Sequence, residues 1–388
     1  MAINWRARWR DSRPYVLAVA VFLCSRLVIL LAIDFASIYL PLWKSDSWQS
    51  GPHWYDRLLR WDSEWYAGIA AHGYHFNGNA DELQPVVFYP LYPLFSRFVA
   101  EIAGTSPAVA LLLVANVAAV LAALLLCRLA RRYFDDDVAV LSVALLSFYP
   151  GSLFLSAGYT ESLALLLILT CFTLLDDRRY VFASVAAGLA AATRSVGIVL
   201  LPVLLWELWL HFRTNRRRFV VYAIVGVAIA SSGLWIYMLY LEMAFGHPLA
   251  FADAQAAFNG DRSLGTRLVA ALTLQPVLRL RFTDFSPAGL DQWFFILLLL
   301  LTVAAWRRLS GSLGLYSLGA LMVPYLTLSG GPGGLTSMTR FGLLAFPAFI
   351  MLADLCRRSL WLCVVTMGLF AAILALHSAL FAQWYWVG

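Results

Sequence analysis

The sequence predicts an all-α, polytopic membrane protein with about 11 transmembrane helices, and three observations support this fold class. Of the 388 residues, 62% are hydrophobic and only 13% are charged, which is about half of the charged share of a soluble domain. So few charges cannot coat the exterior of a soluble protein of this length. Apolar runs cover nearly the whole chain, which excludes a soluble enzyme with one appended anchor.

Eleven apolar runs are the candidate spans, and we treat residues 1–388 as a single integral membrane domain. The runs cover 15–40, 107–130, 137–150, 159–175, 180–193, 196–212, 219–242, 292–306, 312–328, 341–356 and 360–381. Some are shorter than the usual span of about 20 residues. The first run is too long for the core of a signal peptide, so we expect a retained helix there.

The arginines predict the side of the membrane on which each loop lies. Seventeen of them form six clusters between the runs, and Lys44 is the only lysine. The clusters are Arg6, Arg8, Arg10 and Arg13; Arg128, Arg131 and Arg132; Arg178 and Arg179; Arg213, Arg216, Arg217 and Arg218; Arg307 and Arg308; and Arg357 and Arg358. With a cytoplasmic N-terminus and eleven spans, every cluster is cytoplasmic, as the positive-inside rule expects.

This topology accounts for the net charge of +6 without a nucleic-acid partner. The long connections 41–106 and 243–291 then lie outside, so we expect an extracytoplasmic active site in a bacterial inner or plasma membrane. No Gly-x-x-x-x-Gly-Lys run is present, which argues against a nucleotide-dependent reaction. The five cysteines form no C-x-x-C motif and are interpreted as packing residues.

Loop 41–106 is the segment that we expect to be catalytic. Trp61, Trp65 and Ile69 have the spacing i, i+4, i+8 and form one apolar stripe of a helix, with Gly73 as its stop signal. Tryptophan on such a stripe is typical of a helix in the membrane interface.

Asp62 and Glu64 are the two acids of this aromatic stretch. From the residues alone, Asp62 is first interpreted as a helix N-cap, with a partly desolvated general base as the functional alternative. In one helix the two carboxylates lie about 200° apart and cannot both face one substrate. If both act, the helix must begin after them; otherwise we favour Asp62.

Several other polar residues are predicted to lie on the outer side of the membrane, and each has two interpretations. His72 at a helix end is more often a dipole partner than a catalyst. Glu161 and Arg194 could form an ion pair between helix ends, or Arg194 could bind a phosphate. Arg340 follows the glycine-rich run 330–334, which could cradle an anion but is better interpreted as a flexible turn.

Arg26 and the connection 243–291 are two further features of the sequence. Arg26 lies inside the first span and needs a polar partner or a path to the interface, which the sequence does not identify. In the connection 243–291, Leu264, Leu268 and Leu272 have helical spacing, so we expect an amphipathic interfacial helix. This connection is also the segment that we expect to cover a lipid or sugar site.

A set of short motifs resembles the PIG-V mannosyltransferase family, whose members are membrane glycosyltransferases of the GT-C type. The motifs are RWDSEWY at 60–66, IAAHGY at 69–74, FYPLYP at 88–93, AGYTESL at 157–163, ATRSVG at 192–197 and RFGLLAFP at 340–347. Each is short, but they keep the family's order along most of the chain.

The resemblance implies a GT-C-like fold with interfacial helices on the outer face. It also implies an inverting transfer of a sugar, with mannose expected, from a polyprenyl-phosphate donor to a lipid or glycan acceptor among the membrane lipids. Eukaryotic members modify a GPI anchor, which a bacterium does not make, so the acceptor stays open. Asp62-Ser63-Glu64 matches the family's pair of acids in the first outer loop.

The residues implied for the site are therefore Asp62 and Glu64 as catalytic acids and a larger group for substrate binding. The substrate-binding group is Arg60, His72, Tyr74, Tyr89, Tyr92, Tyr159, Glu161, Arg194 and Arg340. In the mechanism that fits, Asp62 takes the acceptor proton while Arg194, Arg340 or His72 stabilises the leaving phosphate. No cofactor or metal is required, and a divalent cation at Asp62 and Glu64 stays an open alternative.

The competing function is a transporter or flippase of a lipid-linked sugar. It explains many spans and buried charges equally well, but it predicts inverted repeats and helices broken near the middle of the membrane. The sequence shows no clear repeat, and its polar motifs gather at one predicted face. We therefore favour the transferase.

Overall fold

The computed structural model describes residues 5–43, 53–79, 81–259, 264–274, 287–328 and 337–387, and these residues form helices and loops only. The helices are α1 (Trp5–Tyr39), η1 (Trp54–Leu58), α2 (Asp62–His72), η2 (Pro85–Val87), α3 (Leu91–Ala103), α4 (Pro107–Ala130), α5 (Asp136–Phe148), η3 (Pro150–Leu155), α6 (Glu161–Asp176), α7 (Tyr180–Ala191), η4 (Ser195–Val199), α8 (Leu200–Phe212), α9 (Arg216–Phe245), α10 (Ala250–Asp253), α11 (Gln255–Asn259), α12 (Leu264–Leu272), α14 (Pro287–Arg308), α15 (Gly311–Leu328), α16 (Met338–Phe341), η5 (Gly342–Leu344), α17 (Phe346–Arg357) and α18 (Leu360–Ala382).

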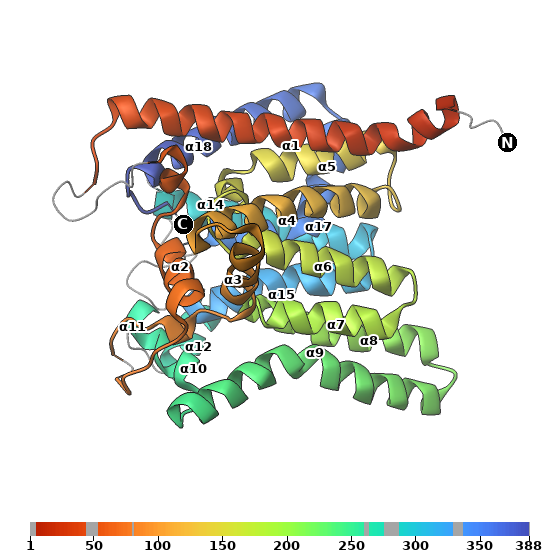
Figure 1. The fold of residues 1–388 in the computed structure, drawn as a ribbon. Helices are drawn as coiled ribbons and strands as arrows, with labels where there is room; N and C mark the ends of the chain where they lie inside the picture. Colours follow the sequence, from red (N-terminus) through yellow and green to blue (C-terminus); the bar gives the residue numbers. More distant parts are fainter. Residues whose placement is uncertain are drawn as a thin grey trace.

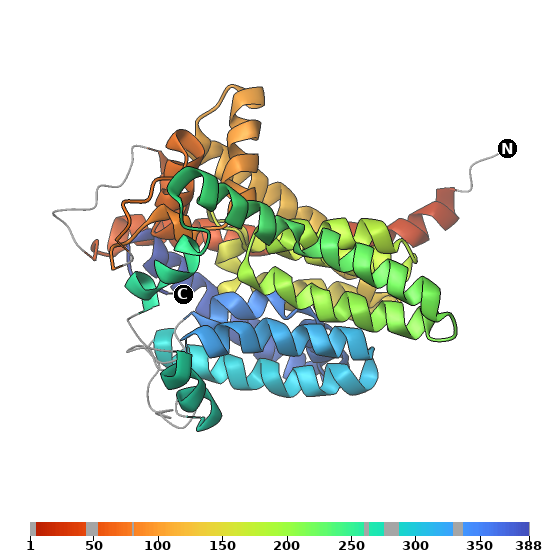
Figure 2. The same ribbon diagram turned by 90° about the horizontal axis from the view of Figure 1, so that it is seen from below.

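The long helices run side by side as one bundle, and the short helices gather at one end of it (Figure 1). We call this end, which carries α2, α3, α10, α11 and α12, the cap end; the C-terminal residues also lie here. The turns α4–α5, α6–α7 and α8–α9 lie at the opposite end, which the second view confirms (Figure 2). The arginine clusters at these turns therefore share one end of the bundle, whereas the membrane face that this end occupies stays a prediction.

The predicted spans coincide with helices, but their number is not confirmed. Each of the eleven apolar runs overlaps a helix of the described chain. Among the described residues, six helices are long and apolar enough to cross a membrane by themselves, and one bent pair, Met338–Leu344 with Phe346–Arg357, could add a seventh. The protein is thus an integral membrane protein with a helical bundle, and the count of eleven spans stays a prediction.

Arg26 finds its polar partners at the break between α5 and α6. Its guanidinium group donates to the carbonyl oxygens of Ser147 (2.9 Å) and Ser152 (2.8 Å) and to the hydroxyl of Ser156 (2.9 Å). Carbonyl groups at a helix end lack partners within the helix, and a buried one without a partner is costly. Arg26 therefore provides hydrogen-bond partners for the connection between α5 and α6, which leads into Tyr159 and Glu161.

The predicted amphipathic helix of the connection 243–291 is present as α12. Ala270 and Ala271 are buried, and the Tyr325 hydroxyl of α15 donates to the Ala271 carbonyl oxygen (2.9 Å). Leu268 and Leu272 are exposed, as expected for a helix whose apolar stripe faces lipid. The glycine-rich run 330–334, interpreted above as a turn or an anion cradle, lies outside the described residues.

Candidate active site

Helix α2 begins abruptly at Asp62, directly after a residue with an unusual backbone. Trp61 occupies the N-cap position with φ 56° and ψ −116° and makes no side-chain cap bond. A non-glycine residue with positive φ costs about 1–3 kcal/mol and tends to occur at functional sites. Asp62 is the first helical residue, so its N-cap interpretation is wrong. The predicted stop is confirmed, because Gly73 ends the helix with φ 82°.

The carboxylate of Asp62 belongs to a network of four charged side chains, which we call the ion network. Arg340 donates to Asp62 Oδ2 (2.7 Å) and also to Glu161 Oε1. Arg194 donates to the same Glu161 oxygen and to the Thr160 hydroxyl (2.8 Å). The predicted ion pair between Glu161 and Arg194 is therefore confirmed, and it extends through Arg340 to Asp62.

The ion network is buried at one end and open at the other. Side-chain exposure rises from none at Glu161 through 5% at Arg340 to 22% at Asp62. The two carboxylates and two guanidinium groups balance each other formally, which is how buried charges are tolerated in proteins. Asp62 is thus the member that can meet a ligand while the others hold it from behind.

Aromatic rings enclose the Arg340 guanidinium group. Its central carbon lies 4.4 Å from the ring centroid of Tyr159 and 5.1 Å from that of Phe154. The Tyr159 hydroxyl in turn donates to the carbonyl oxygen of Arg60 (3.0 Å), at the residue before Trp61. Cation–π contacts and this hydrogen bond therefore tie the η3–α6 connection to the start of α2.

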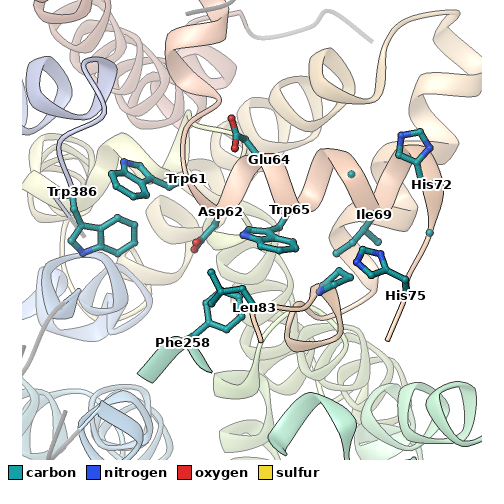
Figure 3. A pocket seen from close by; sticks show the side chains of 13 residues that line it. Trp61, Asp62, Glu64, Trp65, Ile69, His72, His75, Leu83, Phe258 and Trp386 are labelled. Carbon is teal, nitrogen blue, oxygen red and sulfur yellow. The ribbon is translucent and has the colours of Figure 1, made fainter. Parts of the chain in front are cut away.

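A pocket of about 790 Å³ opens beside Asp62. Figure 3 shows the Asp62 carboxylate near Trp61, Trp65 and Phe258, whereas Glu64 points away on another side of α2. The predicted stripe of Trp61, Trp65 and Ile69 faces this pocket together, which the helical spacing allows. His72 and His75 line the same pocket near the other end of α2. The pocket is therefore lined by aromatic rings, two imidazoles and both acids of α2, Asp62 and Glu64.

Glu64 differs from Asp62 in its surroundings. Partial burial raises the pKa of the Glu64 carboxyl group, and the nearby Arg60 cation opposes this shift. Within the part of the chain that the structure describes, no group of three or more His, Cys, Asp or Glu side chains could hold a metal ion. The divalent cation at Asp62 and Glu64 stays a prediction.

Arg60 lies beside the pocket but does not line it. Its side chain is 2% exposed, donates to the Ala382 carbonyl oxygen (3.2 Å) and lies 4.7 Å from the Trp384 ring centroid. Burial lowers the pKa of Arg60 to about 10. The structure thus shows Arg60 joining α2 to the C-terminal residues, and its predicted contact with substrate stays a prediction.

Three of the predicted tyrosines pack within the cap end rather than along the pocket. Tyr74 donates to the Phe88 carbonyl oxygen (2.7 Å) and Tyr92 to the Leu111 carbonyl oxygen (2.9 Å). Tyr89 packs against other aromatic rings, and burial raises its pKa to about 12. The Tyr74 hydroxyl thus joins two parts of loop 73–90, and the Tyr92 hydroxyl joins α3 to α4. A role of these tyrosines in substrate binding stays a prediction.

Two aromatic residues of the pocket were not predicted from the sequence. Trp386, in the C-terminal segment, packs edge-on against Trp61 at a centroid distance of 5.2 Å and lines the pocket. Phe258, in α11, packs against Trp65 at 6.1 Å and lines the opposite part. The aromatic content of both segments was visible, but no sequence pattern links either of them to residue 62.

One family model matches part of the chain. The model of the family described as dolichyl-phosphate-mannose-protein mannosyltransferase matches residues 84–237, which is less than half of the chain. That range contains Glu161 and Arg194 but neither Asp62 nor Arg340. No curated protein matches the chain significantly. The narrower PIG-V resemblance therefore stays a prediction.

Solved structures resemble the chain over nearly its whole length. The archaeal oligosaccharyltransferase AglB from Archaeoglobus fulgidus, in complex with an inhibitory peptide and a dolichol-phosphate, has a TM-score of 0.52 at 14% identity. The alignment covers 98% of this chain and 57% of that one. The same enzyme tethered to an acceptor peptide has a TM-score of 0.51 at 14% identity, with coverages of 98% and 56%.

ArnT from Cupriavidus metallidurans bound to undecaprenyl phosphate is a third similar structure, with a TM-score of 0.48, 16% identity and coverages of 96% and 76%. The chain spans little more than half the length of the oligosaccharyltransferase. Identities this low establish a shared fold and leave activity open. The chain therefore shares the fold of the matched part of the archaeal oligosaccharyltransferase.

Proposed function

We propose that this protein is an inverting glycosyltransferase. It moves a sugar, expected to be mannose, from a polyprenyl-phosphate donor to a lipid or glycan acceptor on the outer face of the membrane. One observation carries the proposal: Asp62, the most exposed member of the ion network, lies in the wall of an aromatic pocket of about 790 Å³. The partial match to a mannosyltransferase family and the shared fold with a dolichol-phosphate-bound enzyme support it.

In the proposed reaction, Asp62 is the general base. The acceptor hydroxyl oxygen attacks the anomeric carbon, the bond from that carbon to the phosphate oxygen breaks, and polyprenyl phosphate leaves. Arg340 holds Oδ2 of the carboxylate, and we assign the departing hydroxyl proton to Oδ1. A single displacement of this kind inverts the anomeric configuration and needs one base.

The pocket walls suggest how the donor is held. A sugar ring has apolar faces, and aromatic rings such as Trp65, Phe258 and Trp386 offer flat apolar surfaces for them. Because Arg194 and Arg340 are already bonded to carboxylates, we assign them to holding the acids in place. His72 lines the pocket directly, so we assign it to the charge that develops on the leaving phosphate.

The test uses purified protein with radiolabelled polyprenyl-phosphate-mannose and a membrane lipid extract. A new labelled glycolipid is expected from the wild type. Asp62→Asn keeps the side-chain volume but removes the base, so we expect a loss of at least about 100-fold in the transfer rate. Glu101→Gln is the matched control, because it makes the same change from carboxylate to amide at an exposed residue of α3 that pairs with Arg97, and its rate should stay within a few-fold of wild type.

Two results would contradict the proposal. Near wild-type transfer by a folded Asp62→Asn variant would remove Asp62 from the role of base. Movement of the intact donor between the leaflets of a vesicle, with no labelled product, would instead support the transporter.

A further inference from the structure

The carboxyl group of Asp291 is buried and takes no part in the ion network. Asp291, near the start of α14, is 3% exposed. It accepts hydrogen bonds from the backbone N–H groups of Ser337 (2.7 Å) and Thr339 (2.6 Å). In the described part of the chain it forms no salt bridge. The two backbone N–H groups therefore supply hydrogen bonds that a buried carboxyl group needs.

The segment that Asp291 binds, α16, has little stability of its own. Helix α16 consists of only four residues, Met338–Phe341, and so short a helix has little stability of its own. Ser337 occupies the N-cap position with φ 69° and makes no side-chain cap bond. The carboxylate of Asp291 supplies the missing cap from a different helix.

The held segment is the one that carries Arg340. Thr339, whose amide binds Asp291, is the residue directly before Arg340, and Arg340 bonds both Asp62 and Glu161. A shift of the α16 backbone would therefore move the guanidinium group away from the base. Misplacement by about 1 Å is enough to cost about 100-fold in rate at an active site.

We propose that Asp291 is a positioning residue for the transfer reaction: it fixes the α16 backbone so that Arg340 keeps Asp62 in place. This inference rests on the proposed function, because it assigns Arg340 and Asp62 to the reacting site. A carboxyl group suits the task, since each of its two oxygens accepts from a different backbone amide.

Asp291→Asn is the direct test. Asparagine has one carbonyl oxygen, so its NH₂ group must face one of the two amides and that bond is lost. We expect kcat to fall at least tenfold while the donor KM stays within twofold, because Asp291 lies outside the pocket lining. Asp291→Glu, which keeps both oxygens on a longer side chain, should fold and show a smaller fall in kcat.

Thr302→Val is the matched control in the same helix. Thr302 is buried in α14 and bonded to Ser317 (2.7 Å), so its loss disturbs the bundle core without touching α16. We expect a lower unfolding temperature with an unchanged kcat. Equal kcat values for folded Asp291→Asn and wild type, or a change confined to the donor KM, would overturn the positioning role.

A double-mutant cycle separates this inference from the proposed function. Unfolding of Asp291→Asn, Arg340→Gln and the double variant can be measured in detergent without any transfer assay. Coupled sites give non-additive effects, which we expect here because Asp291 acts through the backbone next to Arg340. Additive effects would overturn the coupling even if transfer is observed, whereas a wild type without transfer activity would overturn only the proposed function.

Discussion

Glu161 shows how strongly single residues depend on each other within the ion network. Its side chain is fully buried, its Oε1 atom accepts from both Arg194 and Arg340, and its Oε2 atom has no hydrogen-bond partner among the residues that the structure describes. An acid in this position is stable only while cations neutralise it. We therefore expect Arg194→Ala to lower the free energy of unfolding by about 3–5 kcal/mol and Arg194→Lys to lower it less.

The matched control for Arg194 is an exposed pair at the protein surface. Arg97 and Glu101 form an i, i+4 salt bridge of 3.3 Å, with side chains 47% and 67% exposed. Because solvent screens such a pair, Arg97→Ala should change stability by no more than about 0.5 kcal/mol. Denaturant unfolding of both variants in detergent measures the difference. Similar losses for the two variants would mean that burial does not set the energetics of the network.

The sequence identified the residues of the ion network one at a time but could not assemble them. Asp62, Glu161, Arg194 and Arg340 were each recognised by motif and by predicted side. Their bonding depends on how α2, α6, α16 and the α7–η4 turn pack, and no local spacing records that packing. The same limit explains why Asp62 was first interpreted as an N-cap: its actual partner is 278 residues away.

At the scale of elements, the short helix η3 and the α16 segment lie in direct backbone contact. A Cβ atom at Gly151 would overlap the carbonyl oxygen of Thr339 and lie 3.0 Å from the Thr339 carbonyl carbon. Because backbone cannot swing aside, Gly151→Ala should separate the two segments and move Arg340. We expect a loss of about 1–3 kcal/mol in stability, as for other overpacked sites, together with a lower transfer rate.

Gly368 provides the control, since a Cβ atom there would meet no heavy atom within 4 Å. It lies inside α18, where replacing glycine with alanine should stabilise the helix by about 0.5–1 kcal/mol. Thermal unfolding and the transfer rate of both variants test the argument. If Gly151→Ala unfolds at the wild-type temperature, the close approach of η3 and α16 is not required.

Most elements could be predicted because apolar periodicity is a local property, whereas bends between elements could not. The predicted run 341–356 divides at Ala345, and its two parts are bent by 87°. Pro347 in the first turn of α17 is compatible with a helix start, but the sequence alone does not show the bend. Arg340, which bonds Asp62, lies on the other side of this bend from α17, so the site includes a helix interruption that the apolar run does not reveal.

At the scale of the whole molecule, the pocket that contains Asp62 and the arginine-rich turns lie at opposite ends of the bundle. The pocket, α2 and the C-terminal residues lie at the cap end, and the α8–α9 turn with its exposed arginines lies at the other (Figure 1). The positive-inside rule then predicts that the cap end is extracytoplasmic. A lipid-linked donor in the outer leaflet could reach Asp62 only if this orientation holds.

Single cysteines at the two ends test the orientation. Asn77 is exposed in the loop after α2, and Arg217 is exposed at the start of α9. In a background where the accessible native residues Cys24 and Cys363 are replaced by alanine, Asn77→Cys should react with an impermeant thiol reagent in intact cells. Arg217→Cys should react only after the membrane is permeabilised. The reverse pattern would place Asp62 in the cytoplasm, and the pocket would then face soluble donors rather than lipid-linked ones on the outer surface.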